Sequence, residues 1–149
     1  MRKFIFVIVL SSIIGSCSPN TKIEKEDFDI VIPDLEHEYT EVSEKIIFWE
    51  DIFGFDQEMY FVYFYSQTCS HCEEIKNEMI EKALASDNLY FVQSSNKNVL
   101  KNDVSFTIGV GNVGDFAILG YPSLVKIVNG LVVENVAGKF NIEKLINSL

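Results

Sequence analysis

Two cysteines three positions apart are the residues of this chain with the clearest capacity for chemistry. Cys69 and Cys72 enclose Ser70 and His71 in the sequence Cys-Ser-His-Cys. A C-x-x-C pair can cycle between a dithiol and a disulfide, and the thiolate is its reactive form. A disulfide across so short a loop removes only about 2 kcal/mol of unfolded-chain entropy. The pair is therefore better explained by redox chemistry than by stability.

A buried strand and an amphipathic helix are expected to hold this pair. The residues from Met59 to Tyr65 are all aromatic or apolar, which is typical of a strand buried on both faces of a sheet. Apolar residues at helical spacing follow the pair, namely Ile75, Met79, Ile80, Ala83 and Leu84. A short loop over residues 66–68 then places Cys69 at the start of the helix. There, free backbone N–H groups and the positive end of the helix dipole stabilise a thiolate.

Length, composition and charge limit the class of protein. The chain has 149 residues, 48% of them hydrophobic, which is enough for one domain with a core of its own. The net charge of −10 argues against nucleic-acid binding, because nucleic-acid binders carry a basic surface. The same charge argues against electrostatic docking on anionic lipid.

The first residues have the pattern of a secretory signal over residues 1–16. Arg2 and Lys3 precede a short apolar stretch that is too short for a comfortable membrane-spanning helix, and small residues lead to Cys17. Residues 14–17, Ile-Gly-Ser-Cys, resemble the lipobox of bacterial lipoproteins, which implies that Cys17 carries lipid and begins the mature chain. An ordinary cleaved signal with an incidental cysteine is the alternative.

The number of cysteines agrees with export from the cytoplasm. If Cys17 carries lipid, Cys69 and Cys72 form a single remaining pair in an oxidising compartment. Acyl chains on Cys17 would hold the protein on a membrane, and the polar residues 17–27 predict a flexible tether. We therefore expect an extracytoplasmic protein that is lipid-anchored to a bacterial cell membrane.

The segment before the central strand predicts one strand and one helix. Residues 28–32 alternate weakly between apolar and polar side chains, as in a short edge strand. A helical pattern runs from Tyr39 to Phe53 and ends at Gly54. His37, just ahead of this helix, has no ligand-like neighbours in the sequence and is expected at the surface.

The second half of the chain completes an α/β pattern. The expected elements are a strand over 89–92, a short strand or arm over 104–108, at most a turn or two of helix over 115–119, and strands over 123–128 and 131–136. Asn129-Gly130 between the last two strands is a strong hairpin signal. The C-terminus predicts an amphipathic helix with Asn141 as its N-cap. Together these elements predict a central mixed β-sheet flanked by helices over residues 28–149.

Three features together resemble the thioredoxin-like family over most of residues 28–149. They are the buried strand leading into C-x-x-C and a helix, the sequence Gly120-Tyr121-Pro122 before a strand, and the Asn-Gly hairpin followed by Gly138 and a terminal helix. The resemblance implies a thioredoxin-like fold with a cis bond between Tyr121 and Pro122, lying against the cysteine pair. It further implies that Tyr121 and Pro122 receive an extended substrate by strand-like hydrogen bonds, with Thr68 beside the pair.

The chain departs from the family pattern at three places. Six residues before the first cysteine, where thioredoxin, protein disulfide isomerase and periplasmic disulfide oxidases usually carry a buried Asp or Glu, this chain has Tyr63. The usual carboxylate that assists proton removal from the second cysteine is thus missing. Thr68 stands in place of the thioredoxin tryptophan, and the helix lacks the proline that often kinks it. The chain therefore resembles a divergent, exported member of the family.

The positions of the two sulfurs predict their roles. Cys69 would form a mixed disulfide with a partner, and Cys72, one turn into the helix and more buried, would resolve it. A protonated His71 would stabilise the Cys69 thiolate and make the pair a stronger oxidant, whereas a merely solvated His71 would tune nothing. Ser70-His71 also resembles the middle of disulfide oxidases and isomerases.

These residues predict a membrane-anchored thiol-disulfide oxidoreductase with a slight lean to oxidation or isomerisation. Its partners would be the thiols and disulfides of exported proteins, together with a membrane redox partner that resets the pair. The alternative is a thioredoxin-like accessory lipoprotein, for example for an export system, whose thiols are not catalytic, because a fold does not fix a function.

Metal and nucleotide binding are disfavoured, and no cofactor is expected. Cys69, His71 and Cys72 supply at most three ligands where a structural zinc needs four, and a cis-proline beside the thiols would obstruct a metal. Residues 109–114 spell G-x-G-x-x-G, with Glu134 about twenty residues further on. The helical segment after them is too short for the crossover of a parallel unit, so the motif more plausibly forms a turn.

Overall fold

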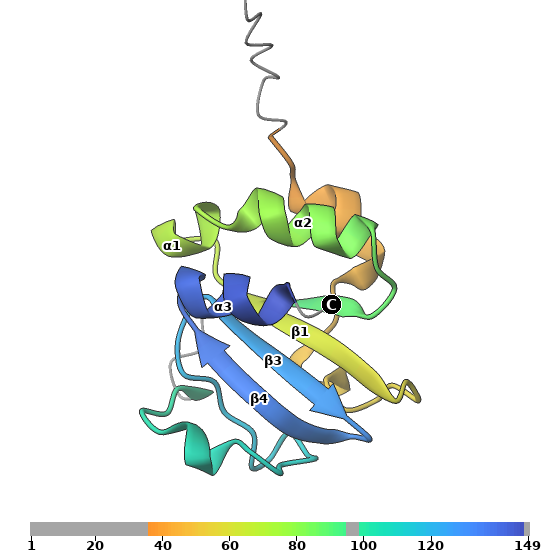
Figure 1. Ribbon diagram of the computed structural model, residues 1–149, viewed down its shortest axis with the longest axis vertical. Coiled ribbons are helices and arrows are strands. Elements are labelled where there is room, and N and C mark those ends of the chain that lie inside the picture. The colour runs from red at the N-terminus through yellow and green to blue at the C-terminus, as the bar shows by residue number, and fades with distance from the viewer. Residues whose placement is uncertain (1–35, 95–98, 148–149) are drawn as a thin grey trace, which may run out of the picture. The chain divides into compact units, whose positions relative to one another are not determined.

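The computed structural model of the protein describes residues 36–94 and 99–147 (Figure 1). Its strands are β1 (Met59–Tyr65), β2 (Leu89–Gln93), β3 (Ser123–Val128) and β4 (Leu131–Ala137). Its helices are α1 (Ser70–Glu73), α2 (Lys76–Leu84) and α3 (Lys139–Ile146), with 3-10 segments η1 (Tyr39–Lys45), η2 (Trp49–Asp51) and η4 (Val104–Phe106). The predicted signal, Cys17, the tether and the edge strand over 28–32 lie outside the described residues.

The four strands form one mixed sheet in the order β2-β1-β3-β4. β1 and β2 are parallel and are connected through α1 and α2, whereas β3 pairs antiparallel with both β1 and β4. Asn129 and Gly130 turn the β3-β4 hairpin with φ of 50° and 75°. Positive φ at both central residues suits the right-handed twist of the flanking strands. The predicted mixed sheet and its terminal hairpin are therefore confirmed.

Alternation along β1 builds a core on each face of the sheet. Phe61, Tyr63 and Tyr65 pack with buried residues of η1, α2 and α3 on one face. The intervening residues Tyr60, Val62 and Phe64 pack on the other face with the segment around η2 and with residues 116–118. The helices α2 and α3 lie over the same side of the strands in Figure 1. The strand is thus buried on both faces, as its unbroken apolar sequence predicts.

The helix expected from Tyr39 to Phe53 is instead two short 3-10 segments. The chain becomes extended at Ile46, which forms a parallel bridge to Phe91, and the N–H of Ile47 donates to the Phe91 carbonyl over 2.8 Å. The apolar residues before this break pack in the core on the face covered by α2 and α3. Those after the break pack in the core on the opposite face of the sheet. Two segments on opposite faces of one sheet can therefore imitate the spacing of a single amphipathic helix.

The structure refines two smaller expectations and contradicts the N-cap expected at Asn141. Residues 104–106 form the 3-10 segment η4, and residues 115–119 form no helix, because Ile118 bridges to Leu100 instead. The helix α3 begins at Lys139 with Gly138 as its N-cap, so Asn141 lies in the first turn. The side-chain amide of Asn141 donates to the carbonyl of Ala137 over 3.0 Å, which ties this first turn to the end of β4.

Candidate active site at the Cys69–Cys72 pair

The end of β1 delivers the cysteine pair to the edge of the sheet. The chain turns after Tyr65, the N–H of Cys69 donates to the carbonyl of Ser66 over 3.1 Å, and Cys69 becomes the N-cap of α1. Cys69 and Cys72 are joined by a disulfide, with their Cα atoms 5.2 Å apart. Cys72 is 1% exposed, whereas Cys69 is partly exposed. Cys72 is therefore the more buried residue of the pair, as its position in the helix predicts.

The first turn of the helix provides the polar contact to the outer sulfur. The backbone N–H of Cys72 donates to Sγ of Cys69 over 3.1 Å. The expected single helix is broken at Ile75 (φ −118°, ψ 0°), so α1 spans only four residues before α2 begins. The electrostatic effect of the helix dipole at Cys69 is small because so few peptide units are aligned in α1. A hydrogen bond from a backbone N–H, in contrast, is strong at short range and becomes stronger when its acceptor is an anion. In the bonded state the N–H of Cys72 is thus a close polar contact to the Cys69 sulfur.

The two residues between the cysteines are exposed. The side chain of His71 is 73% exposed, and its Nδ1 lies 3.2 Å from the carboxylate of Glu74. Ser70 is also exposed, as is Thr68, whose Oγ1 lies 3.3 Å from Oγ of Ser66. The sequence reasoning missed Glu74, although its spacing of three residues from His71 on a helical pattern indicates such a pair.

The cis-proline segment lies on the strand next to the cysteine loop. The Tyr121–Pro122 peptide bond is cis, as the resemblance implied. In the sheet register Phe64 pairs with Ser123, so Pro122 stands beside the end of β1 from which the cysteine loop departs. The carbonyl of Pro122 accepts a hydrogen bond of 3.0 Å from the N–H of Gly138, which holds the start of β3 against the start of α3. The structure thus brings Tyr121 and Pro122 to the same end of the sheet as Cys69.

The known proteins that this chain is similar to include thioredoxins. No protein-family model matches the chain. A thioredoxin domain-containing protein of Theileria parva is 27% identical over 138 residues, which is 93% of this chain and 56% of that protein. Mitochondrial thioredoxin 3 of Saccharomyces cerevisiae has a similar structure, with 17% identity, a TM-score of 0.47, and coverage of 74% of this chain and 99% of its own. Thioredoxin of Plasmodium falciparum matches with 18% identity and a TM-score of 0.46, over 70% of this chain and 97% of its own.

The order of elements and the surroundings of the disulfide define the fold class. A mixed four-stranded sheet is flanked by helices, the C-x-x-C disulfide follows the buried central strand, and a cis-proline precedes the neighbouring strand. The domain has a thioredoxin-like fold. Its bonded pair of adjacent cysteines is consistent with thiol-disulfide redox activity in general.

Tyr63 occupies the core of this thioredoxin-like domain at the place of the expected carboxylate. Its hydroxyl and that of Tyr39 are buried, and among the described residues neither has a hydrogen-bond partner of good geometry. Burial raises the pKa of Tyr63 far above its usual value, and the nearby Tyr39 and Glu73 raise it further. Tyr63 therefore stays protonated at any physiological pH, so it cannot accept a proton as a carboxylate would.

Replacing Tyr63 by Phe is expected to reduce the loss of stability at alkaline pH. The stabilising contribution from the raised pKa is complete below the unfolded-state pKa of about 10 and is lost as the pH rises toward the folded-state value. Phe has no proton to lose, so the variant should have a flatter stability profile above about pH 10. Urea unfolding of both proteins at neutral and alkaline pH measures the difference. An equally steep alkaline decline in Y63F would contradict the buried, neutral hydroxyl.

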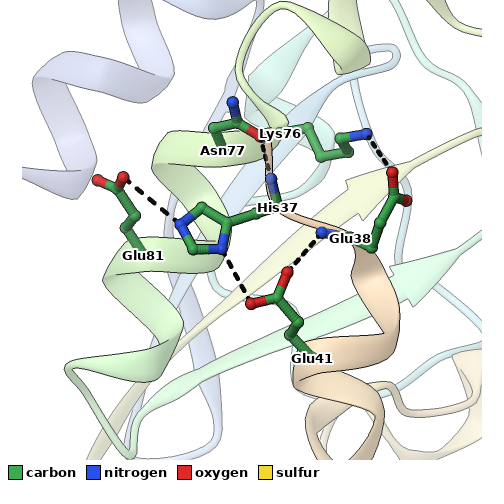
Figure 2. Close-up of polar contacts among 6 residues, drawn as sticks. All are labelled: His37, Glu38, Glu41, Lys76, Asn77 and Glu81. Carbon is green, nitrogen blue, oxygen red and sulfur yellow. Dashed lines mark hydrogen bonds and ion pairs between the residues drawn. The ribbon is translucent and has the colours of Figure 1, made fainter. Parts of the chain in front are cut away.

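A second polar cluster lies between η1 and α2 (Figure 2). His37 is 6% exposed, so the expectation of a surface histidine was wrong. Its Nδ1 lies 3.0 Å from the Glu41 carboxylate and its Nε2 lies 3.6 Å from that of Glu81, while its backbone N–H donates to Asn77 over 3.0 Å. Glu81 and Asn77 belong to α2, far away in the sequence. These contacts fasten the start of the described chain to the helix that follows the active site.

The glycine-rich segment packs on the β3-β4 hairpin. The N–H of Gly109 donates to the Val132 carbonyl over 2.8 Å, and the N–H of Val132 donates to the Val110 carbonyl over 2.9 Å. A Cβ atom at Gly111 would lie 2.9 Å from the carbonyl oxygen of Gly130, so glycine permits this close approach. In the described chain beyond residue 114 no helix begins before Lys139, so the segment lacks the helix that a dinucleotide fingerprint requires.

The described part of the chain holds neither a metal-ligand cluster nor a membrane-spanning helix. Within residues 36–94 and 99–147, no three His, Cys, Asp or Glu side chains are grouped so that they could hold a metal ion. In the same part of the chain, no helix has the length and apolar character needed to cross a membrane.

Proposed function

We propose that this thioredoxin-like protein is an extracytoplasmic thiol-disulfide oxidoreductase that exchanges disulfides with exported proteins. The bonded Cys69–Cys72 pair supports the proposal, because Cys69 is partly exposed and its sulfur accepts a backbone N–H, while Cys72 is buried. A purely structural disulfide would stabilise little across so short a loop. The chain covers 56% of the length of its Theileria relative, so the activity is proposed for this chain on its own geometry.

The proposed reaction transfers two electrons from a client to the pair. A client thiolate attacks Sγ of Cys69, the Cys69–Cys72 bond breaks, and Cys72 leaves as a thiolate that takes up a proton. A second client thiolate then attacks the client sulfur of the mixed disulfide. The client gains a disulfide, Cys69 leaves as a thiolate, and a membrane redox partner reoxidises the pair. Run in reverse, the same steps reduce a client.

The residues around the pair support docking of an extended client. Thr68 is exposed directly before Cys69, and Tyr121 and Pro122 stand at the neighbouring strand end. We assign Tyr121 and Pro122 to the backbone ledge that receives the client by strand-like hydrogen bonds. We assign His71 and Ser70, the two residues between the cysteines, to tuning of the potential, because His71 when protonated would stabilise the Cys69 thiolate and thereby the reduced form.

The location is part of the proposal and is supported by the sequence alone. Residues 1–16 have the pattern of a secretory signal, and Cys17 stands at the cut as in a lipobox. Lipid on Cys17 and a tether over residues 17–27 would keep the domain at a bacterial membrane. There it would meet unfolded exported chains and its membrane redox partner.

The reduction potential of the pair and a Cys69→Ala variant test this function. We expect a potential less negative than the value of about −270 mV for thioredoxin, displaced toward the value of about −120 mV for a strong oxidant. We also expect C69A to lose the oxidative refolding of a reduced client protein. A strongly reducing potential would overturn the lean to oxidation. If C69A kept the full refolding activity, the proposed enzymatic function would be refuted and the role of an accessory protein would be favoured.

A further inference from the structure

We propose that a groove between the active-site loop and Phe48 binds a client segment that carries an apolar side chain and basic residues. The proposal rests on the proposed exchange function and names the sequence class that the site would prefer. Three adjoining hollows of about 200, 330 and 620 Å³ make up the groove. Gln93, the last residue of β2, lines all three, and Gln67 lines the first two.

The groove begins beside Thr68, the residue before Cys69, and runs away from the cis-proline. Thr68, which lines its first hollow, directly precedes Cys69. The groove then crosses the ends of β1 and β2 and reaches the extended segment around Ile46, which bridges to Phe91 of β2. Because β2 and β3 flank β1 on opposite sides, this surface is separate from the ledge of Tyr121 and Pro122. A client joined to Cys69 could therefore occupy both surfaces at once.

The far end of the groove is suited to an apolar side chain. Phe48 is 77% exposed and Ile46 is 36% exposed, and both line the largest hollow together with Trp49. Covering these exposed apolar side chains with an apolar client residue removes apolar surface from water. In the middle of the groove the side-chain amides of Gln67 and Gln93 offer both donors and acceptors. An extended polypeptide presents the backbone groups that such amides bind.

The charge at the groove selects the client further. The carboxylate-bearing residues Glu38 and Glu50 line its second and third hollows. Glu38 shares Lys76 with Glu73 at N–O distances of 3.4 and 3.1 Å, so one lysine faces two carboxylates there. The chain as a whole carries a net charge of −10. Complementary charge speeds association, so lysine or arginine beside the apolar residue is favoured.

Peptides that differ only at the positions facing this groove test the proposal. A reduced full-length Cys72→Ser variant is mixed with peptides whose single cysteine is bonded to glutathione. The Cys69 thiolate attacks the peptide sulfur, glutathione leaves as a thiolate, and the mixed disulfide is followed by mass spectrometry. One peptide series carries Phe and Lys at successive distances from the cysteine, and its counterpart carries Ser and Glu. We expect the best Phe/Lys peptide to react about tenfold faster than its Ser/Glu counterpart. This is the change that a tenfold gain in affinity would produce.

Two matched variants locate the effect. In the same background, Phe48→Ala should remove most of the preference for the Phe/Lys peptide. Phe140→Ala should retain it, because Phe140 is equally exposed, at 78%, but lies on α3 and outside the groove. Oxidised glutathione, which is too small to reach Phe48, should react at the same rate with all three proteins.

The outcomes separate this inference from the proposed function. Equal rates for both peptide series would refute the proposed preference of the groove for apolar and basic residues. The proposed exchange function would be unaffected. The same result is expected if the chain's own first 35 residues cover the groove, and it would overturn the inference equally. Loss of the preference in F140A would also overturn it. No reaction with either peptide or with oxidised glutathione would instead refute the exchange function on which the groove depends.

Discussion

A Cys72→Ser variant is expected to accumulate as covalent complexes with its clients, joined through Cys69. In the wild type the Cys72 sulfur is already within bonding distance of Sγ of Cys69, so its attack on a mixed disulfide is intramolecular. Well-oriented intramolecular reactions have effective concentrations far above those of any free thiol. Loss of this thiol should lengthen the life of the mixed disulfide on the order of 10³-fold or more. Non-reducing gels of cells expressing the variant would show the complexes.

The reciprocal variant is the control for this trap. In Cys69→Ser the remaining sulfur of the pair is that of Cys72, which is 1% exposed, so clients should scarcely reach it. We expect few or no complexes with this variant. Equal trapping by C69S and C72S would mean that both sulfurs are accessible, and the assignment of attacking and resolving roles would then fail.

Replacing Phe91 by Ala is expected to destabilise the domain by about 3–5 kcal/mol. Phe91 is fully buried on β2, and its ring lies 5.7 Å from that of Tyr63 and 6.0 Å from that of Tyr39 in edge-to-face arrangements. Truncation would leave a cavity in the core against which the cysteine helix packs. Because domains are stable by only about 5–15 kcal/mol, this is a large share of the total. Urea unfolding with the disulfide intact measures it.

Phe140→Ala provides the control for truncation of a phenylalanine. The ring of Phe140 is 78% exposed, so its removal should change the free energy of unfolding by no more than about 0.5 kcal/mol. A loss of less than about 1 kcal/mol in F91A would contradict the close packing of the aromatic cluster between β2 and η1.

Features encoded by neighbouring residues could be predicted from the sequence. Seven successive apolar or aromatic residues predict β1, and Asn129-Gly130 predicts the hairpin. The two cysteines identify the candidate site without any structure, because their spacing places one helical turn between them. The cis state of the Tyr121–Pro122 bond came only from the resemblance, since an X-Pro bond takes its isomer from the tertiary context.

Features made by distant residues could not be predicted in this way. His37 was expected at the surface, but its partners Asn77 and Glu81 come from a helix far along the chain. The helical pattern from Tyr39 to Phe53 hides a crossing from one face of the sheet to the other, which becomes visible only when Ile46 pairs with Phe91. Periodicity measures spacing along the chain and carries no information on which layer each turn contacts.

The sequence by itself therefore determined the chemistry of this protein, namely a C-x-x-C pair placed between a buried strand and a helix in an α/β domain. Only the tertiary structure decided the surroundings of that pair: the disulfide-bonded geometry beside the cis-proline, the unpartnered hydroxyl of Tyr63 and the groove that leads to Phe48. The physical reason is that residue type and spacing set local conformation and reactivity. Burial, pKa and surface shape instead arise from elements that meet only when the sheet and its two cores assemble.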